Sequence, residues 1–183
     1  MVGKMLANVS GTVTEQAGWQ FLGSTKLASA ATTTASVSIA ACDMLIIEYM
    51  VTGYSGNGIA SFRFNGDAAG TSLYMWRFLH SLAGGVTWVN TASAAATGLI
   101  QTGPIAIVTQ RVGRLRINNF AGVSHPMSID GQSSATALSS PTLAIGEGEY
   151  SPAGGSQITS VVMVSTANNL NAGSGFAVYG INL

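Results

Sequence analysis

The chain has 183 residues and zero net charge, with 47% of its residues hydrophobic and only 8% charged. This length and apolar content predict one ordered domain with its own core, and the lack of a basic excess gives nucleic-acid binding no electrostatic support. Typical soluble domains carry roughly 25% charged residues. The deficit therefore favours a surface that meets other protein, in a homo-oligomer or a particle; the alternative is a monomer covered by small residues.

Residues 1–18 are polar and show no periodic pattern, so they predict an extended N-terminal arm or a loosely packed terminus. From residue 19 to residue 183, short apolar runs alternate with clusters of Gly, Pro, Asn and Ser, as strands alternate with turns. The predicted strands are 19–28, 35–40, 44–54, 59–65, 72–79, 105–110, 114–120, 142–148, 157–165 and 175–183. About ten short strands predict an all-β fold, an antiparallel β-sandwich of jelly-roll type.

Two segments in this pass have a more specific expectation. Residues 44–54 are nearly continuously apolar, which predicts a strand buried on both faces. Residues 91–99 are rich in alanine but end at Gly98, so at most one helical turn is predicted there.

The stretch Phe-Arg-Phe-Asn-Gly-Asp at 62–67 joins an alternating strand to an acidic corner. Asn-Gly after such a strand indicates a tight turn, because both residues tolerate positive φ. No other carboxylate, histidine or cysteine lies close in sequence to complete a metal shell. The sequence therefore predicts a turn at Asn65, Gly66 and Asp67 rather than a metal or catalytic site.

Three of the seven cations lie within six residues, at Arg111, Arg114 and Arg116. Arg114 and Arg116 alternate with aliphatic residues, so we expect the arginines to line one sheet face while the aliphatic side chains enter the core. Two interpretations remain open: a solvated outer face, or an interface stripe that binds partner carboxylates bidentately.

Glu147 and Glu149 lie on one strand face if the chain is extended there, roughly 7 Å apart. That separation falls within the range used by inverting glycosidases. The surrounding segment 146–155 is rich in glycine and predicts a flexible acidic loop instead, suited at most to loose Ca²⁺ binding. We therefore expect no catalytic residue, no cofactor and no metal, and a protein that is not an enzyme.

The histidines and the cysteine are isolated in the sequence. His80, His125 and Cys42 do not show the spacing of a zinc site, so we expect all three to be structural. A single cysteine excludes an intrachain disulfide. The start of the chain lacks a signal-peptide core, and no apolar run approaches the length of a membrane span, so we expect synthesis in a host cytoplasm without a membrane partner.

Tyr74, Trp76 and Phe78 alternate along one strand, which places them on a single face and predicts core packing. Together with Trp88, they offer an alternative interpretation as a platform for carbohydrate. That alternative requires exposed indole rings.

The stretch 62–67, followed by Tyr74, resembles a pattern in a loose family of small tailed-bacteriophage virion proteins. The segment 158–183, with Gly173-Ser174 before a short alternating strand and Tyr179-Gly180 after it, is similar to the end of those proteins. The Ala-Ala-Gly-Thr-Ser-Leu loop after Asp67 departs from the polar approach to the tyrosine in that family. The resemblance implies a β-sandwich virion component without enzymatic activity.

Composition and resemblance together predict a virion structural protein, in particular a capsid cement or decoration protein. Its expected partners are the major capsid protein and further copies of itself, as in a trimer. We expect Arg111, Arg114, Arg116 and the N-terminal arm to make these contacts. A tail or fibre module that binds a host glycan is the alternative, with exposed Trp88 or Trp76 as its expected feature.

Overall fold

The computed structural model describes residues 5–9, 12–16, 18–56, 58–67, 74–81, 88–96, 100–101, 110–121, 124–133 and 142–183. In this part of the chain the regular structure is β-strand, apart from a short 3-10 helix, η1, at Ala153–Gly155. The described residues contain no helix long and apolar enough to span a membrane.

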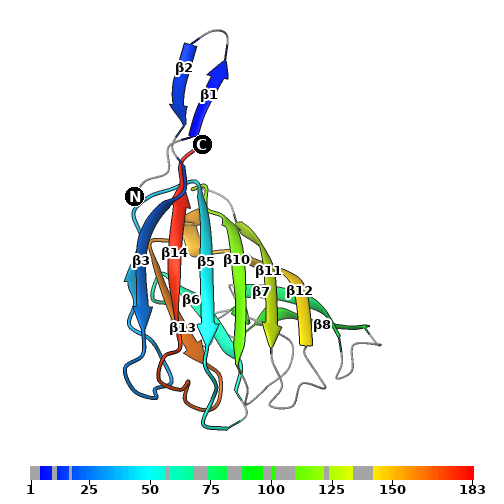
Figure 1. Ribbon diagram of the computed structural model, residues 1–183. Coiled ribbons are helices and arrows are strands. Elements are labelled where there is room, and N and C mark those ends of the chain that lie inside the picture. Colours follow the sequence, from blue (N-terminus) through cyan, green and yellow to red (C-terminus); the bar gives the residue numbers. More distant parts are fainter. Residues whose placement is uncertain are drawn as a thin grey trace.

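The larger sheet has eight antiparallel strands in the order β3-β14-β5-β10-β11-β12-β7-β8. Their bounds are β3 Gln20–Lys26, β14 Gly175–Ile181, β5 Met44–Val51, β10 Arg111–Asn118, β11 His125–Ser133, β12 Thr142–Tyr150, β7 Tyr74–Ser81 and β8 Trp88–Ala96. Figure 1 shows β3 to β12 side by side across the front, with β7 and β8 behind them, so the sheet bends back beyond β12.

The smaller sheet has four strands in the order β4-β13-β6-β9 and covers the inner face of the larger one. Its strands are β4 Val37–Ser38, β13 Ser160–Ser165, β6 Ala60–Phe64 and β9 Ile100–Gln101. Phe62 crosses the gap between the sheets, with its ring edge-on to Tyr49 of β5 and Phe176 of β14 at centroid distances of 5.6 and 5.5 Å. The predicted all-β antiparallel sandwich is confirmed.

The segment predicted as an N-terminal arm contains a hairpin of β1 (Met5–Val9) and β2 (Thr12–Gln16). Figure 1 shows this hairpin projecting from one end of the sandwich. Its register pairs Met5 with Gln16 and Val9 with Thr12.

Two expectations about secondary structure are wrong, and one segment contains a strand that was not predicted. Residues 44–54 are not buried on both faces: alternate residues of β5 are buried and Met50 is 47% exposed, because the smaller sheet covers one side only. Where at most one helical turn was predicted, the described residues 91–96 form a strand: β8 extends to Ala96 and pairs with β7, and pairing overrides the helix propensity of alanine. Residues 146–155 are not one loop, because β12 continues to Tyr150.

β11 was not predicted, nor were β8, the short β9 and the two strands of the N-terminal hairpin. β11 contains His125-Pro126, which favoured a turn, but the proline lies at the second strand position, before pairing with β10 begins, where its missing N–H is tolerated. The predicted strand at 105–110 lies outside the described residues except for Gln110.

Gly113 of β10 sits where neighbouring strands approach too closely for a side chain. A Cβ atom there would lie 2.2 Å from the carbonyl oxygen of Asp130 and 2.3 Å from the hydroxyl of Tyr49. We expect Gly113→Ala to lower the free energy of unfolding by about 2–3 kcal/mol through overpacking. Gly66→Ala, where a Cβ meets nothing within 4 Å but φ is +69°, should cost about 1 kcal/mol from strain alone. Urea titration of both variants shows which one loses more free energy of unfolding. Equal losses would contradict the steric explanation for Gly113.

Candidate interaction surface on the larger sheet

Side chains of the larger sheet that point away from the smaller sheet form one surface, here called the outer face. Cross-strand register aligns Glu48, Arg114 and Asp130 in one row across β5, β10 and β11. A second row contains Arg116, Ser128, Glu147 and Arg77 across β10, β11, β12 and β7.

The outer face holds eight of the fourteen Lys, Arg, Asp and Glu residues of the chain. These are Lys26, Arg77, Arg114, Arg116, Glu48, Asp130, Glu147 and Glu149. Four are cationic and four anionic, so the face is neutral while carrying most of the charge of the protein. This concentration arises from strand pairing, because the eight residues are spread over sequence positions 26 to 149.

Two ion pairs lie within the outer face. Arg114 donates from Nε and Nη2 to one carboxylate oxygen of Glu48, with the Nε distance at 3.1 Å. Arg77 Nε lies 2.6 Å from Glu147 Oε1. Both pairs are well exposed, with side-chain exposures between 40% and 63%. Among the described residues, Arg116 has no carboxylate partner within 4.0 Å.

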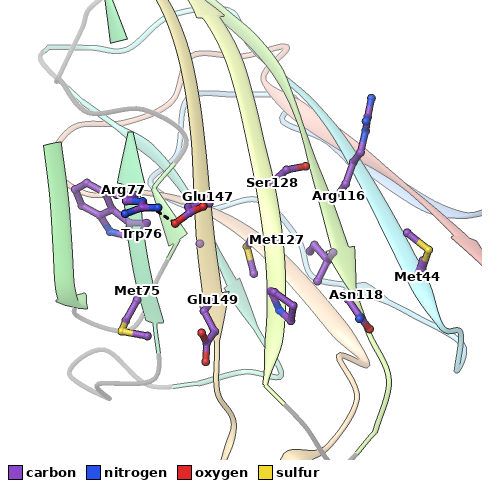
Figure 2. Close-up of a pocket in the computed structure, with 13 residues that line it drawn as sticks. Met44, Met75, Trp76, Arg77, Arg116, Asn118, Met127, Ser128, Glu147 and Glu149 are labelled. Atoms are coloured by element: carbon purple, nitrogen blue, oxygen red, sulfur yellow. Dashed lines mark ion pairs between the residues drawn. The ribbon is translucent and has the colours of Figure 1, made fainter. Parts of the chain in front are cut away.

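A hollow of about 750 Å³ opens on this face over β5, β10, β11, β12 and β7. Figure 2 shows Arg77 and Glu147 at one side of the hollow, and Arg116 and Met44 at the other. Met75 and Glu149 line it near the ion pair, and Glu149 accepts a hydrogen bond of 2.9 Å from the Ser151 hydroxyl. The hollow is therefore lined by methionines and edged by charges of both signs.

The outer face is also rich in exposed apolar side chains. Seven of the ten large hydrophobic side chains exposed in the described part of the chain belong to it. They are Phe21, Met50, Val112, Leu143, Ile145, Leu79 and Met75, each 43–62% exposed. A surface that mixes exposed apolar side chains with paired charges has the composition of a protein interface.

The prediction that three arginines share a face is correct for two of them. Arg114 and Arg116 alternate with Leu115 and Ile117, which are fully buried. Arg111 lies on the core-facing side instead, only 2% exposed, because its position differs from 114 by an odd number of residues. Burial raises the pKa of Tyr54, and the positive charge of the Arg111 guanidinium offsets part of that rise. Arg111 is therefore not available to the outer face.

Asn65, Gly66 and Asp67 form a turn with φ of 53° at Asn65 and 69° at Gly66, closed by a 3.0 Å bond from the Asp67 amide to Phe64 O. The Asp67 carboxylate accepts a hydrogen bond of 3.1 Å from the Tyr74 hydroxyl, which itself accepts one of 2.9 Å from the Phe64 amide. These hydrogen bonds explain why Tyr74 follows the turn sequence: its hydroxyl binds both ends of the turn and links them to β7 in the core.

Of the other sequence candidates, Trp76, Phe78 and His125 lie in the core. Trp76 is 8% exposed and Phe78 is 1% exposed, so the core packing predicted for them is confirmed. The Trp88 and His80 side chains lie outside the described residues. His125 is buried, with its ring nitrogens 3.0 Å from Asn118 O and 2.9 Å from Ser156 O. The described residues contain no group of three or more potential metal ligands.

Cys42 and Asn119 form a buried polar contact; the sequence predicted the burial of Cys42 but not the contact with Asn119. Cys42 was expected in the core and is buried there, and burial raises the pKa of its thiol. Asn119 is fully buried and bonds to Cys42 O and to both backbone groups of Ile158. Alternation gives the only sequence signal, since Asn119 is two residues beyond the buried Ile117.

A scan against protein-family models and a search of curated proteins give no match to this chain. Among solved structures, one of the infectious bursal disease virus Gx strain aligns with TM-score 0.17 and 12% identity, over 97% of this chain and 45% of that one. The VP2 subviral particle of infectious bursal disease virus aligns with TM-score 0.12 and 11% identity, over 97% and 44%. The chain thus spans less than half the length of either. Likenesses at these TM-scores carry no argument for fold or function.

The ion pairs of the outer face should contribute little to folding. Exposed pairs of this kind are typically worth below about 1 kcal/mol because water and salt screen them. A double-mutant cycle with Glu48→Gln and Arg114→Gln, read by urea unfolding, is expected to give a coupling energy below that value. A coupling of several kcal/mol would instead assign these charges to fold stability.

Proposed function

We propose that this chain is a structural component of a virion, a capsid decoration protein that acts through protein–protein contacts of its outer face. The observation that carries the proposal is the gathering of eight of the fourteen charged residues on one sheet face, among exposed apolar side chains. The resemblance of the 62–67 and 158–183 segments to tailed-phage virion proteins supplies the context.

The physical argument concerns what the charges are for. With only 8% charged residues, the chain has few charged side chains available to keep its surface soluble. Exposed ion pairs add little stability, whereas arginines and carboxylates at an interface give orientation and specificity. Concentrating them on one face therefore favours a role in recognition over a role in folding.

The test is fractionation of particles from the source of this sequence. Purified virions are expected to contain the chain in fixed ratio to the major shell protein, and to lose it or become less stable when Arg114 and Arg116 are both replaced by serine. An Arg63→Ser variant changes a charge on β6 of the other sheet and serves as the control. Particles that lack the chain, or carry it only at a tail tip, would refute the decoration role.

A glycan-binding tail module is the second candidate. Trp76 is buried and does not support it, but Trp19 and Phe21 are 39% and 62% exposed, and Phe21 meets the Tyr179 ring edge-on at 5.8 Å. Exposed aromatic faces of this kind suit sugar rings. Glycan-array binding that Phe21→Ala abolishes would favour this candidate, and an array without binding would remove it.

A further inference from the structure

We infer that the outer face is first of all the contact between two copies of this chain, and that Arg116 of each copy enters the hollow of the other. The inference deepens the proposed function by naming the partner of the outer face. The pair is then the unit that attaches to a shell, so losing the self-contact weakens attachment as well.

Charge balance favours a second copy as the occupant. A face that recognises a partner of one charge sign carries an excess of the other. The outer face has four cations and four anions, so two copies meet without net repulsion, and each can satisfy the charges of the other.

The strand register supplies a specific arrangement. A two-fold axis parallel to the strands and over β11 places β10 of one copy above β12 of the other. Arg116 then faces Glu147, because Ser128 lies between them in the same row. Val112 faces Leu143 in the same way, through Gln132. A single operation thus matches Arg116 with Glu147 and Val112 with Leu143, and it sets Arg114 opposite Ile145.

The hollow fits an arginine side chain. Its methionines are flexible and polarisable and can pack along the apolar stem of the incoming Arg116. The guanidinium then reaches the side of the hollow that carries Glu147 and Glu149. Glu147 already pairs with Arg77, whereas Glu149 accepts a hydrogen bond from the Ser151 hydroxyl, so Glu149 gains most from a second arginine.

The available area is about what a specific pair needs. About the axis over β11 the overlapping strands run from β5 to β7, roughly 20 Å wide by strand spacing and about 25 Å long by rise, or roughly 500 Å² per copy. Two such faces bury roughly 1,000 Å² in total, the approximate area expected of a specific interface. Stacked sheets cross at about 30°, so residues far from the two-fold axis shift most relative to the residues they face. Arg116 is only one strand from the axis and still faces Glu147 of the other copy.

Asp130 provides an independent signature of this axis. It lies on β11 and therefore faces its own symmetry copy, with Arg114 beside it in register. Like charges placed opposite each other disfavour association. Asp130→Asn should therefore tighten the pair, an effect that a contact elsewhere on the chain would not produce.

Sedimentation velocity of the purified full chain over a range of micromolar concentrations is the test. The wild type is expected to form a reversible dimer. Arg116→Glu should raise the dissociation constant at least about tenfold, and adding Glu149→Arg should recover part of the loss, with the Arg77–Glu147 pair untouched. Arg63→Glu, a charge reversal on the other sheet, should change nothing. Circular dichroism confirms that each variant is folded.

Three results overturn the inference: a wild type that stays monomeric, a dimer that Arg116→Glu leaves unchanged, or a dimer that Asp130→Asn weakens. These outcomes are separate from those for the proposed function. A monomer in solution that is found stoichiometrically on particles removes the self-contact and keeps the virion role. A dimer that is missing from particles keeps the self-contact and removes the virion role.

Discussion

Replacing Asn119 by alanine is expected to lower the free energy of unfolding by about 3–5 kcal/mol, measured by urea titration. The side chain is fully buried at the end of β10. Its Oδ1 accepts the Ile158 amide at 2.7 Å, and its Nδ2 donates to Cys42 O at 3.1 Å and to Ile158 O at 3.3 Å. These bonds connect the end of β10 in the larger sheet to the irregular segment that leads into β13.

The loss should be large because water cannot replace these bonds. Ile158 is fully buried, so its amide and carbonyl both become unsatisfied in the variant, at roughly 1–3 kcal/mol each. Cys42 O suffers less, because Gln157 Nε2 also donates to it at 3.2 Å. The alanine additionally leaves a small cavity.

The neighbouring residue is the matched control. Asn118 lies on the outer face, and its Oδ1 accepts a 3.2 Å bond from the exposed Phe120 amide, which water can replace. Asn118→Ala is expected to cost below about 1 kcal/mol. Equal losses at 118 and 119 would show that Asn119 does not hold the two segments together.

Raising the pH above about 10 is expected to unfold the protein cooperatively. Burial raises the pKa of Tyr54, Tyr74 and Tyr150 above its ordinary value, and the Asp67 carboxylate adds to the effect at Tyr74 and Tyr150. Above pH 10 the unfolded chain releases these three protons while the folded chain retains them. Stability is therefore fully present below that pH and falls as pH rises.

The slope can be measured by urea titration across the alkaline range. Each retained proton lowers stability by about 1.4 kcal/mol per pH unit, so three tyrosines approach roughly 4 kcal/mol per unit. Tyr74→Phe should reduce this slope by about one third, although it lowers stability at neutral pH by removing the bond to Asp67. Stability that is constant up to about pH 11 would contradict the burial of these hydroxyls.

Local patterns in the sequence predicted the parts of the fold that depend on neighbouring residues. Alternation placed Phe62 and Phe64 in the core and Arg114 and Arg116 outside it, as burial shows. Segments that rely on partners were missed. The alanines of β8 acquire strand geometry only by pairing with β7. β11 contains a proline that local rules assign to a turn, and its pairing with β12 makes it a strand.

The sequence by itself determined the all-β class, the poverty of charge and, along each strand, which residues face the core, because side-chain direction alternates with period two. Only the tertiary structure decided which strands are neighbours. Arg77 meets Glu147, and Arg114 meets Glu48, across separations that no local pattern encodes. The gathering of charges on one face is therefore a consequence of strand order and register, which the whole packed core selects.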